Sequence, residues 1–138
     1  MSYSRYMALA TANWLAQVAA FPALPSNTWL SLHSALPDPI TGNNELIGGG
    51  YLRANVDWVI APNPTEVTMA NNAPIIFPVA TATLGNVTHF GVWDLNANGN
   101  FLAFGEFDVI AQWVNGTSFV VPLNQLQLDV VTQLVTVP

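Results

Sequence analysis

The chain has 138 residues, of which 51% are hydrophobic and only 7% are charged, and it contains no cysteine and no lysine. Its only cations are Arg5 and Arg53, and the formal net charge is -6. Two arginines cannot neutralise the phosphates of a nucleic acid, which excludes a nucleic-acid partner. The lack of cysteine excludes thiol catalysis, thiolate zinc sites and disulfide scaffolds.

The length fits a single domain over residues 1–138 that buries about two thirds of the surface its unfolded chain exposes. So weakly charged an exterior favours self-association, and the alternative is a monomer kept soluble by its neutral polar residues. The start of the chain resembles a secretory signal, but Thr11, Asn13 and Gln17 interrupt its apolar run. No stretch approaches the ~20 residues of a membrane span, so we expect a soluble protein made inside a cell, with no membrane partner.

The first element is an amphipathic helix, predicted over residues 1–21. Ser4 is a candidate cap, and Pro22 ends the helical pattern. The apolar stripe recurs at helical spacing and consists of Met7, Ala10, Trp14, Val18 and Phe21. We expect this stripe to pack on a sheet as core, and the alternative is that the helix is lent to a neighbouring subunit.

Short strands separated by turn residues fill the rest of the chain, residues 28–137. A proline- and glycine-rich loop at 34–50 is long enough to have a function of its own. Asn115 and Gly116 form the dipeptide that most strongly indicates a hairpin turn. Strands are predicted at 28–33, 51–58, 66–69, 75–79, 87–94, 101–108, 117–121, 125–131 and 133–137, with a further segment at 109–114. This density of short strands predicts an all-β fold, either a jelly roll or a β-sandwich of about eight strands, preceded by one N-terminal amphipathic helix.

The turn at residues 94–99 matches the opening of a calcium loop, D-x-N-x-N-G. The match then fails, because the bidentate glutamate belongs where Gly105 lies and Glu106 comes one place late. The flanking segments are also predicted strands instead of helices. A hairpin turn that needs left-handed backbone angles is therefore the preferred interpretation.

Two histidines and one pair of carboxylates are the remaining candidates for chemistry. Alternation places His89 on the face of Val87 and Trp93, where a hydrogen-bonded structural role is preferred to acid or base catalysis. His33 has no motif around it and stays unassigned. Residues 106 and 108 are carboxylates at i and i+2, a spacing that glycosidase chemistry could use but that β proteins also show by chance.

No sequence motif places a nucleophile, a triad or a phosphate-binding loop. The glycines at 48–50 lack the G-x-x-x-x-G-K pattern, and no nucleophile elbow is present. Trp58, Trp93 and Trp113 could stack sugars, but large rings more often fill a core. We therefore assign no catalytic, cofactor-binding or metal-ligating residue, expect no cofactor, and predict that the chain is not an enzyme. A carbohydrate-binding or degrading module, supported by the tryptophans and the carboxylate pair, is the competing class.

Two blocks of the chain resemble a family of small bacteriophage virion proteins. They are GGGYLRANV at residues 48–56 and GNVTHFGVWDLNANGNFLAFGEF at residues 85–107. Members share a helical start, a GGGY-x-R-x-x-V segment and a VTHFG-x-x-D hairpin ending G-N-x-L, and they are commonly labelled tail-fibre-like. The C-terminal strands match the family only in style.

The resemblance implies a structural protein of the virion, assembled in the host cell cytoplasm. Within that class we expect a capsid cement or decoration protein that stabilises the head by binding between capsid subunits. Its partners would be the major capsid protein and further copies of itself, as a homodimer or other homo-oligomer. A tail-fibre or baseplate component that contacts tail proteins is the alternative, and its copy number would be lower. The helix and the loop at 34–50 are the expected contact regions, because they carry few charges to desolvate.

Overall fold

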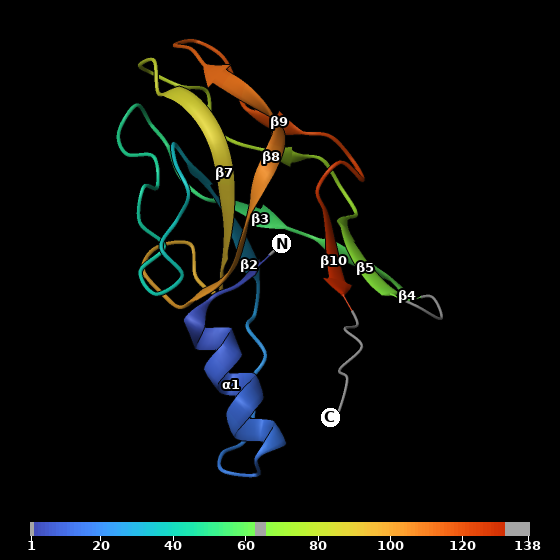
Figure 1. The fold of residues 1–138 in the computed structure, drawn as a ribbon. Coiled ribbons are helices and arrows are strands. Elements are labelled where there is room, and N and C mark those ends of the chain that lie inside the picture. The colour runs from blue at the N-terminus through green and yellow to red at the C-terminus, as the bar shows by residue number, and fades with distance from the viewer. Residues whose placement is uncertain (1, 63–65, 132–138) are drawn as a thin grey trace.

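The computed structural model describes residues 2–62 and 66–131. Over these ranges the chain forms one α-helix and ten β-strands, which confirms the all-β fold with an N-terminal helix (Figure 1). The helix, α1, spans Arg5–Leu15. The strands are β1 Ser2–Tyr3, β2 Thr28–His33, β3 Ala54–Val56, β4 Trp58–Pro62, β5 Glu66–Asn71, β6 Ile75–Ile76, β7 Gly85–Trp93, β8 Phe101–Trp113, β9 Val120–Val121 and β10 Gln127–Val131.

Within the described ranges the strands form three antiparallel sheets. The largest has five strands in the order β1-β8-β7-β2-β3, the second has three in the order β10-β5-β4, and β6 and β9 form the third. Figure 1 shows the five-stranded sheet on one side of the molecule and the β4, β5 and β10 strands on the other. Both contribute to one hydrophobic core, so the architecture is a sandwich of unequal sheets.

The main core lies between the two larger sheets. Leu30 and Leu32 of β2 are fully buried, as the alternation of that strand predicts, and Leu128 of β10 reaches the same cluster from the other sheet. At one end of the core the indole of Trp113 meets the ring of Phe77 edge-on, with the centroids 6.0 Å apart. These two rings are the largest fully buried side chains in the described part of the chain.

Strand β2 is buried on its other face as well. Ser31 and His33 point away from the main core, yet both are fully buried. A second cluster of Trp93, Phe101 and Phe104 lies on this face, and the loop between β2 and β3 covers it. A strand buried on both faces holds polar side chains only where they are hydrogen-bonded, and this applies to Ser31 and His33 below.

Helix α1 is shorter than the sequence predicts. Its first turn is capped as expected, because the Oγ of Ser4 accepts a hydrogen bond of 3.2 Å from the backbone N of Met7. The helix ends at Leu15 instead of residue 21, and Gln17 adopts a left-handed φ of 60°. Apolar periodicity cannot locate this end, because the stripe continues through the irregular segment that follows.

The prediction that the helical stripe is core is wrong for its distal half. Ala10 is buried, whereas Trp14 and Val18 are 58% and 74% exposed. Figure 1 shows the reason, since α1 extends beyond the end of the sheet and only its first turns lie against β1 and β8. The alternative, a helix lent to a neighbouring subunit, stays a prediction.

Three strand predictions also change. The segment at 51–58 divides into β3 and β4, which belong to different sheets, and 101–114 forms the single strand β8. Asn115 and Gly116 make a turn, with Gly116 at φ 84°, but β9 pairs with β6 and not with β8. The predicted strand at 133–137 lies outside the described residues.

Candidate functional site

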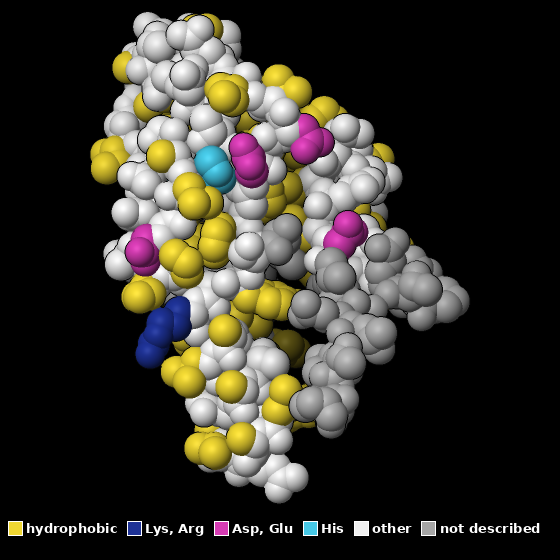
Figure 2. Space-filling model, viewed as in Figure 1, with side chains coloured by type: hydrophobic (Ala, Val, Ile, Leu, Met, Phe, Trp, Pro, Cys, Tyr) yellow, Lys and Arg dark blue, Asp and Glu magenta, His cyan; other side chains and the backbone are white. Residues whose placement is uncertain are grey.

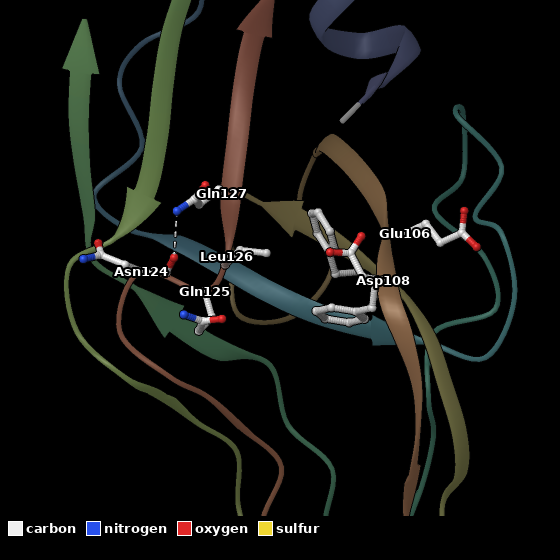
Figure 3. Close-up of a pocket in the computed structure, with 8 residues that line it drawn as sticks. Glu106, Asp108, Asn124, Gln125, Leu126 and Gln127 are labelled. Atoms are coloured by element: carbon white, nitrogen blue, oxygen red, sulfur yellow. Dashed lines mark hydrogen bonds between the residues drawn. The ribbon is translucent and has the colours of Figure 1, made fainter.

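The carboxylate pair at 106 and 108 lines an open cavity of about 310 Å³ beside β10. Asn124, Gln125 and Gln127 form the opposite wall of this cavity (Figure 3). Asp108 lies toward the amides, whereas Glu106 points away from them, and both carboxylates are exposed. The two acidic groups therefore do not converge across a cleft as glycosidase chemistry requires.

The strand that carries this pair is irregular at that place. Val87 on β7 pairs with Ala111 on β8, but two residues further along β7, His89 pairs with Glu106, five residues back along β8. Three additional residues are thus accommodated in β8 as an enlarged β-bulge, since an ordinary bulge inserts one. The bulge places Val109 on the surface, where it is 76% exposed.

His89 is half-buried and hydrogen-bonded, as the structural interpretation predicts. Its Nδ1 lies 2.7 Å from the Oγ1 of Thr88. The prediction that it shares a face with Val87 is wrong, because Val87 packs in the main core with Phe90. The register shift between Val87 and His89 interrupts the alternation on which that prediction depended.

The turn at 94–100 uses its acidic side chain internally. The Oδ1 of Asp94 accepts a hydrogen bond from the backbone N of Asn100 at 2.7 Å, and its Oδ2 accepts one from the Nδ2 of Asn100 at 2.8 Å. Asn98 and Gly99 adopt left-handed φ values of 54° and 80°. The interpretation as a hairpin turn with left-handed angles is confirmed, and both carboxylate oxygens already have donors.

Arg53 joins the two sequence blocks described above. Its Nε and Nη2 donate to the two carboxylate oxygens of Glu45, each at 2.8 Å. Its Nη1 donates to the backbone carbonyls of Leu95 at 3.1 Å and Asn98 at 2.8 Å. The guanidinium also lies 3.8 Å from the ring centroid of Trp93. Arg53 therefore holds the β7–β8 turn against the loop that precedes β3.

This arrangement is largely shielded from water. The side chains of Arg53 and Glu45 are 7% and 22% exposed. A bidentate arginine-carboxylate pair of this kind is strong because both hydrogen bonds are charge-assisted, and the indole ring of Trp93 adds a cation-π contact. We call Glu45, Tyr51, Arg53 and Trp93 the Arg53 cluster.

Tyr51, which follows the three glycines at 48–50, is the remaining member of the Arg53 cluster. Its hydroxyl donates to Glu45 Oε1 at 2.9 Å and accepts a hydrogen bond of 3.1 Å from the backbone N of Leu32. Burial raises the pKa of the Tyr51 phenol far above its usual range, so the hydroxyl stays protonated. The glycines at 48–50 have φ values of 81°, 58° and 75°, which residues with a Cβ rarely adopt. Their role is to turn the chain so that Tyr51 points inward.

A chain of hydrogen bonds links Trp93 of the cluster to the loop that follows β2. Trp93 Nε1 donates to Ser31 Oγ at 2.8 Å, and Ser31 Oγ lies 2.7 Å from His33 Nε2. His33 Nδ1 lies 2.7 Å from the carbonyl oxygen of Asn43. A carbonyl can only accept, so Nδ1 carries the proton, and Nε2 accepts from the Ser31 hydroxyl. His33, unassigned from sequence, thus anchors the loop that follows β2.

The three tryptophans considered for sugar stacking lie in or against the core clusters. Trp93 and Trp113 are buried and Trp58 is half-buried, with its Nε1 donating to Thr28 Oγ1 at 2.7 Å. None of these three rings is a surface platform for a sugar. Among the described residues there is no group of three or more His, Cys, Asp or Glu side chains that could hold a metal ion. In the same part of the chain no helix is long and apolar enough to cross a membrane.

Comparison with models of protein families identifies the class of the chain, which is that of structural proteins of bacteriophage particles. The matching model is described as Podophage GP4 fiber I protein gp80, and it matches residues 2–129. Because the match covers most of the chain, the chain belongs to this family. The prediction of a phage virion structural protein is thereby confirmed. A search of curated proteins gives no match.

Sequence reasoning missed the partners of Arg53. It noted Arg53 as one of two cations but gave no role to Tyr51, which is half-buried against the main core. It assigned no role to Glu45. The scarcity of cations was the available signal, because a single arginine in so apolar a segment needs a carboxylate partner if it is buried.

Proposed function

We propose that the chain is a component of a phage tail fibre and that it works through permanent contacts with other virion proteins, without catalysis. The fibre description of its family supports this assignment. The observation that supports a role without catalysis is the Arg53 cluster. Its polar side chains join the sequence blocks at 48–56 and 85–107, and they are hydrogen-bonded to one another and to the backbone.

Side chains that are hydrogen-bonded in this way stabilise the conformation of the loops that they join. The guanidinium of Arg53 and the hydroxyl of Tyr51 donate to Glu45 and to backbone carbonyls, in a region that is mostly closed to water. A catalytic group needs access to a substrate and a geometry in which it can exchange a proton or form a bond. The cluster instead fixes the hairpin turn and the loop at 34–50 relative to one another.

The outer surface suits permanent contacts. Leu36, Ile40 and Ile47 in the loop between β2 and β3 are 63%, 66% and 90% exposed. Figure 2 shows apolar side chains over much of the visible face, with few charged ones among them. Burying such a surface against another protein removes apolar area from water and desolvates few charges.

The same contacts could serve a fibre or a capsid cement protein, and the family description favours the fibre. We therefore prefer tail proteins to the major capsid protein as partners, and assembly in the host cell cytoplasm before release. The cement role preferred from sequence becomes the second candidate. The two differ in copy number and in whether the chain stays with heads that lack tails.

Quantitative mass spectrometry of purified particles tests the proposal. Intact particles and tail-less heads from the same preparation are compared, with the major capsid protein as the internal standard. A fibre component is expected in intact particles at low copy number relative to the capsid protein, and it is expected to be lost from the heads. Retention in the heads at a high copy number would assign the cement role, and absence from intact particles would refute a structural role in the virion.

A further inference from the structure

The chain contains two Asn-Gly pairs, at residues 98–99 and 115–116. All four residues are exposed, and the φ values of Gly99 and Gly116 are both left-handed, at 80° and 84°. Glycine has no Cβ, so its backbone N can approach the side chain of the preceding asparagine with little steric hindrance. Sequence and exposure make the two pairs similarly reactive, and a difference between them therefore has to come from their hydrogen bonds.

The reaction open to such a pair is deamidation. The backbone N of the glycine attacks Cγ of the asparagine, an N–Cγ bond forms, and the side-chain nitrogen leaves as ammonia, which carries away the proton of the glycine N. Water then opens the cyclic succinimide at either carbonyl and gives aspartate or isoaspartate. Water is the only co-reactant, and no atom is oxidised or reduced. The attack requires that the glycine N is free and that the backbone can rotate to bring it to Cγ.

The pair at 115–116 is held by hydrogen bonds at both of its backbone N atoms. The backbone N of Gly116 donates to the carbonyl oxygen of Ala80 at 2.8 Å. The backbone N of Asn115 donates to Oγ1 of Thr83 at 3.2 Å. The attacking atom is thus already engaged, and the rotation that brings it to Cγ breaks the bond to Ala80 and strains the one to Thr83.

The pair at 98–99 lies at the tip of the β7–β8 turn, where the backbone N atoms are free. Within residues 2–62 and 66–131, no group accepts a hydrogen bond from the backbone N of Gly99 or from those of residues 95–98. The bonds that close this turn lie at its base, between Asp94 and Asn100. Segments with few backbone hydrogen bonds open at a low free-energy cost, so this pair can reach the geometry of attack.

The contact of Arg53 with this turn does not occupy the attacking atom. Arg53 Nη1 donates to the carbonyl oxygen of Asn98 at 2.8 Å, on the other side of the same peptide unit. Rotation of that unit removes one of the four hydrogen bonds of Arg53, and the bonds to Glu45 and Leu95 remain. The Arg53 cluster therefore persists while the tip of the turn rearranges.

We propose that Asn98 is a site of spontaneous deamidation in the folded protein and that the hydrogen bonds around Asn115 protect the second pair. Either product at residue 98 adds a carboxylate and changes the formal net charge from -6 to -7. In isoaspartate the main chain runs through the former side chain, so the carbonyl that Arg53 contacts becomes a free carboxylate. Arg53 then has a second acidic partner besides Glu45. The inference is independent of the proposed place in the fibre.

Peptide mapping by mass spectrometry of the full wild-type chain tests the proposal. Folded protein and protein unfolded in guanidinium chloride are incubated at mildly alkaline pH in heavy-oxygen water, which labels the acid formed during the incubation. In the folded protein we expect Asn98 to convert about tenfold or more faster than Asn115, the factor that two typical hydrogen bonds provide. In guanidinium chloride, where these bonds are lost, we expect the two rates to be similar.

A matched variant tests the cause of the protection. Thr83→Val keeps the shape of the side chain but removes the acceptor of the Asn115 backbone N. It is expected to raise the rate at Asn115 in the folded protein about two- to fivefold, with Asn98 unchanged as the internal reference. An unchanged rate at Asn115 would refute protection by these hydrogen bonds.

Three results with wild-type protein would overturn the proposal. The first is conversion of Asn115 at least as fast as that of Asn98 in the folded protein. The second is a folded protein in which neither site converts although both convert in guanidinium chloride, which would show that the tip of the β7–β8 turn is as closed as the other turn. The third is a preference for Asn98 that persists in guanidinium chloride, which would assign the selectivity to the neighbouring sequence.

Discussion

Arg53 connects parts of the chain that are far apart in sequence. Its bonds to the backbone carbonyls of Leu95 and Asn98 span 42 and 45 residues, and its carboxylate partner Glu45 lies 8 residues away in the preceding loop. Arginine suits this place because its planar fork donates several hydrogen bonds in fixed directions while its face rests on an indole. Lysine offers neither property.

Replacing Arg53 is expected to be costly. Arg53→Ala leaves the carboxylate of Glu45 mostly buried without its cation, which is expected to lower the free energy of unfolding by about 3–5 kcal/mol. Arg53→Lys retains the charge but loses the bidentate geometry, so we expect it to lower the free energy of unfolding by less than Arg53→Ala does. Urea unfolding followed by tryptophan fluorescence measures both.

The other cation of the chain provides the control. Arg5 is exposed at the start of α1, and Arg5→Ala is expected to change stability little. If Arg5→Ala and Arg53→Ala unfold at the same urea concentration, the Arg53 cluster does not hold the hairpin turn.

His33 gives the fold a dependence on pH. Burial lowers the pKa of His33, because desolvation disfavours the charged imidazolium more than the nearby Asn43 carbonyl and Glu45 favour it. Below the usual histidine pKa of about 6.5 the unfolded chain takes up a proton that the folded chain refuses. The stability contributed by neutral His33 is therefore complete above about pH 6.5 and declines as the pH falls toward the lowered pKa of the folded state.

Urea unfolding at about pH 7.5 and pH 5 measures this dependence. Wild-type protein is expected to lose stability on acidification, and His33→Gln, which cannot titrate, should lose less between the same two pH values. Equal losses in the two proteins would show that the hydrogen-bond chain from Trp93 to Asn43 does not exclude the proton.

The roles of Arg53 and His33 could not be predicted from sequence. Periodicity indicates which face of a strand a residue occupies, but it does not indicate which loop covers that face. His33 is buried on the side of β2 that an ordinary two-sheet sandwich exposes, and it is covered by the loop at 34–50, whose path no local pattern specifies. What the sequence did indicate correctly was that residues 94–100 form a hairpin turn with left-handed backbone angles.

The β7–β8 hairpin depends on two glycines that lie opposite bulky or polar neighbours. A Cβ at Gly91 would lie 2.6 Å from Phe101 and from Ser31 Oγ, and 3.0 Å from His33 Nε2. A Cβ at Gly105 would lie 2.6 Å from the ring of Phe90, on the main-core side. Both strands can therefore approach their neighbours only because these positions lack a side chain.

Gly91→Ala and Gly105→Ala are each expected to lower the free energy of unfolding by about 1–3 kcal/mol through overpacking. Only Gly91→Ala should also reduce the loss of stability between pH 7.5 and pH 5, because it displaces Ser31 from His33. Comparison of the two variants at both pH values therefore separates packing from the hydrogen-bond chain. An unchanged pH dependence in Gly91→Ala would contradict that assignment.

Helix α1 shows the limit of pattern-based prediction at the scale of an element. The apolar spacing predicted a helix and its cap correctly, because both depend on residues close in sequence. It did not indicate that the sheet ends before the helix does. Whether Trp14 is core or surface is decided by the length of β8 and the position of β1, which are set by contacts distant in sequence.

At the scale of the molecule, the all-β class followed from many short strands and frequent turns. The pairing of strands did not follow, as Asn115 and Gly116 show. These two residues do form a turn, as predicted, yet the strand after the turn pairs with β6. The carbonyl oxygen of Ala80 accepts a hydrogen bond from the backbone N of Gly116, and the chain crosses there from one sheet to another. Strand partners depend on which apolar faces meet across the core, and this information is not local.

The scarcity of charge has a consequence for the whole molecule. Of the two cations, Arg53 is paired with Glu45 in the Arg53 cluster, and Arg5 lies at the start of α1. Contacts made by such a surface depend mainly on apolar burial, and they should therefore resist salt that would weaken charged contacts. We expect the chain to stay attached to particles washed in about 1 M salt, where the screening length falls to about 3 Å. Release by salt alone, detected by immunoblotting of the wash, would indicate charged contacts instead.

A cryo-EM map of the intact particle tests most directly whether the chain is a fibre component that works through permanent contacts. We predict that the β-sandwich is found on the tail, with α1 covered by neighbouring protein and the Arg53 cluster enclosed within each subunit. Density for the chain at seams between capsid subunits, or particles that lack the chain altogether, would contradict this account.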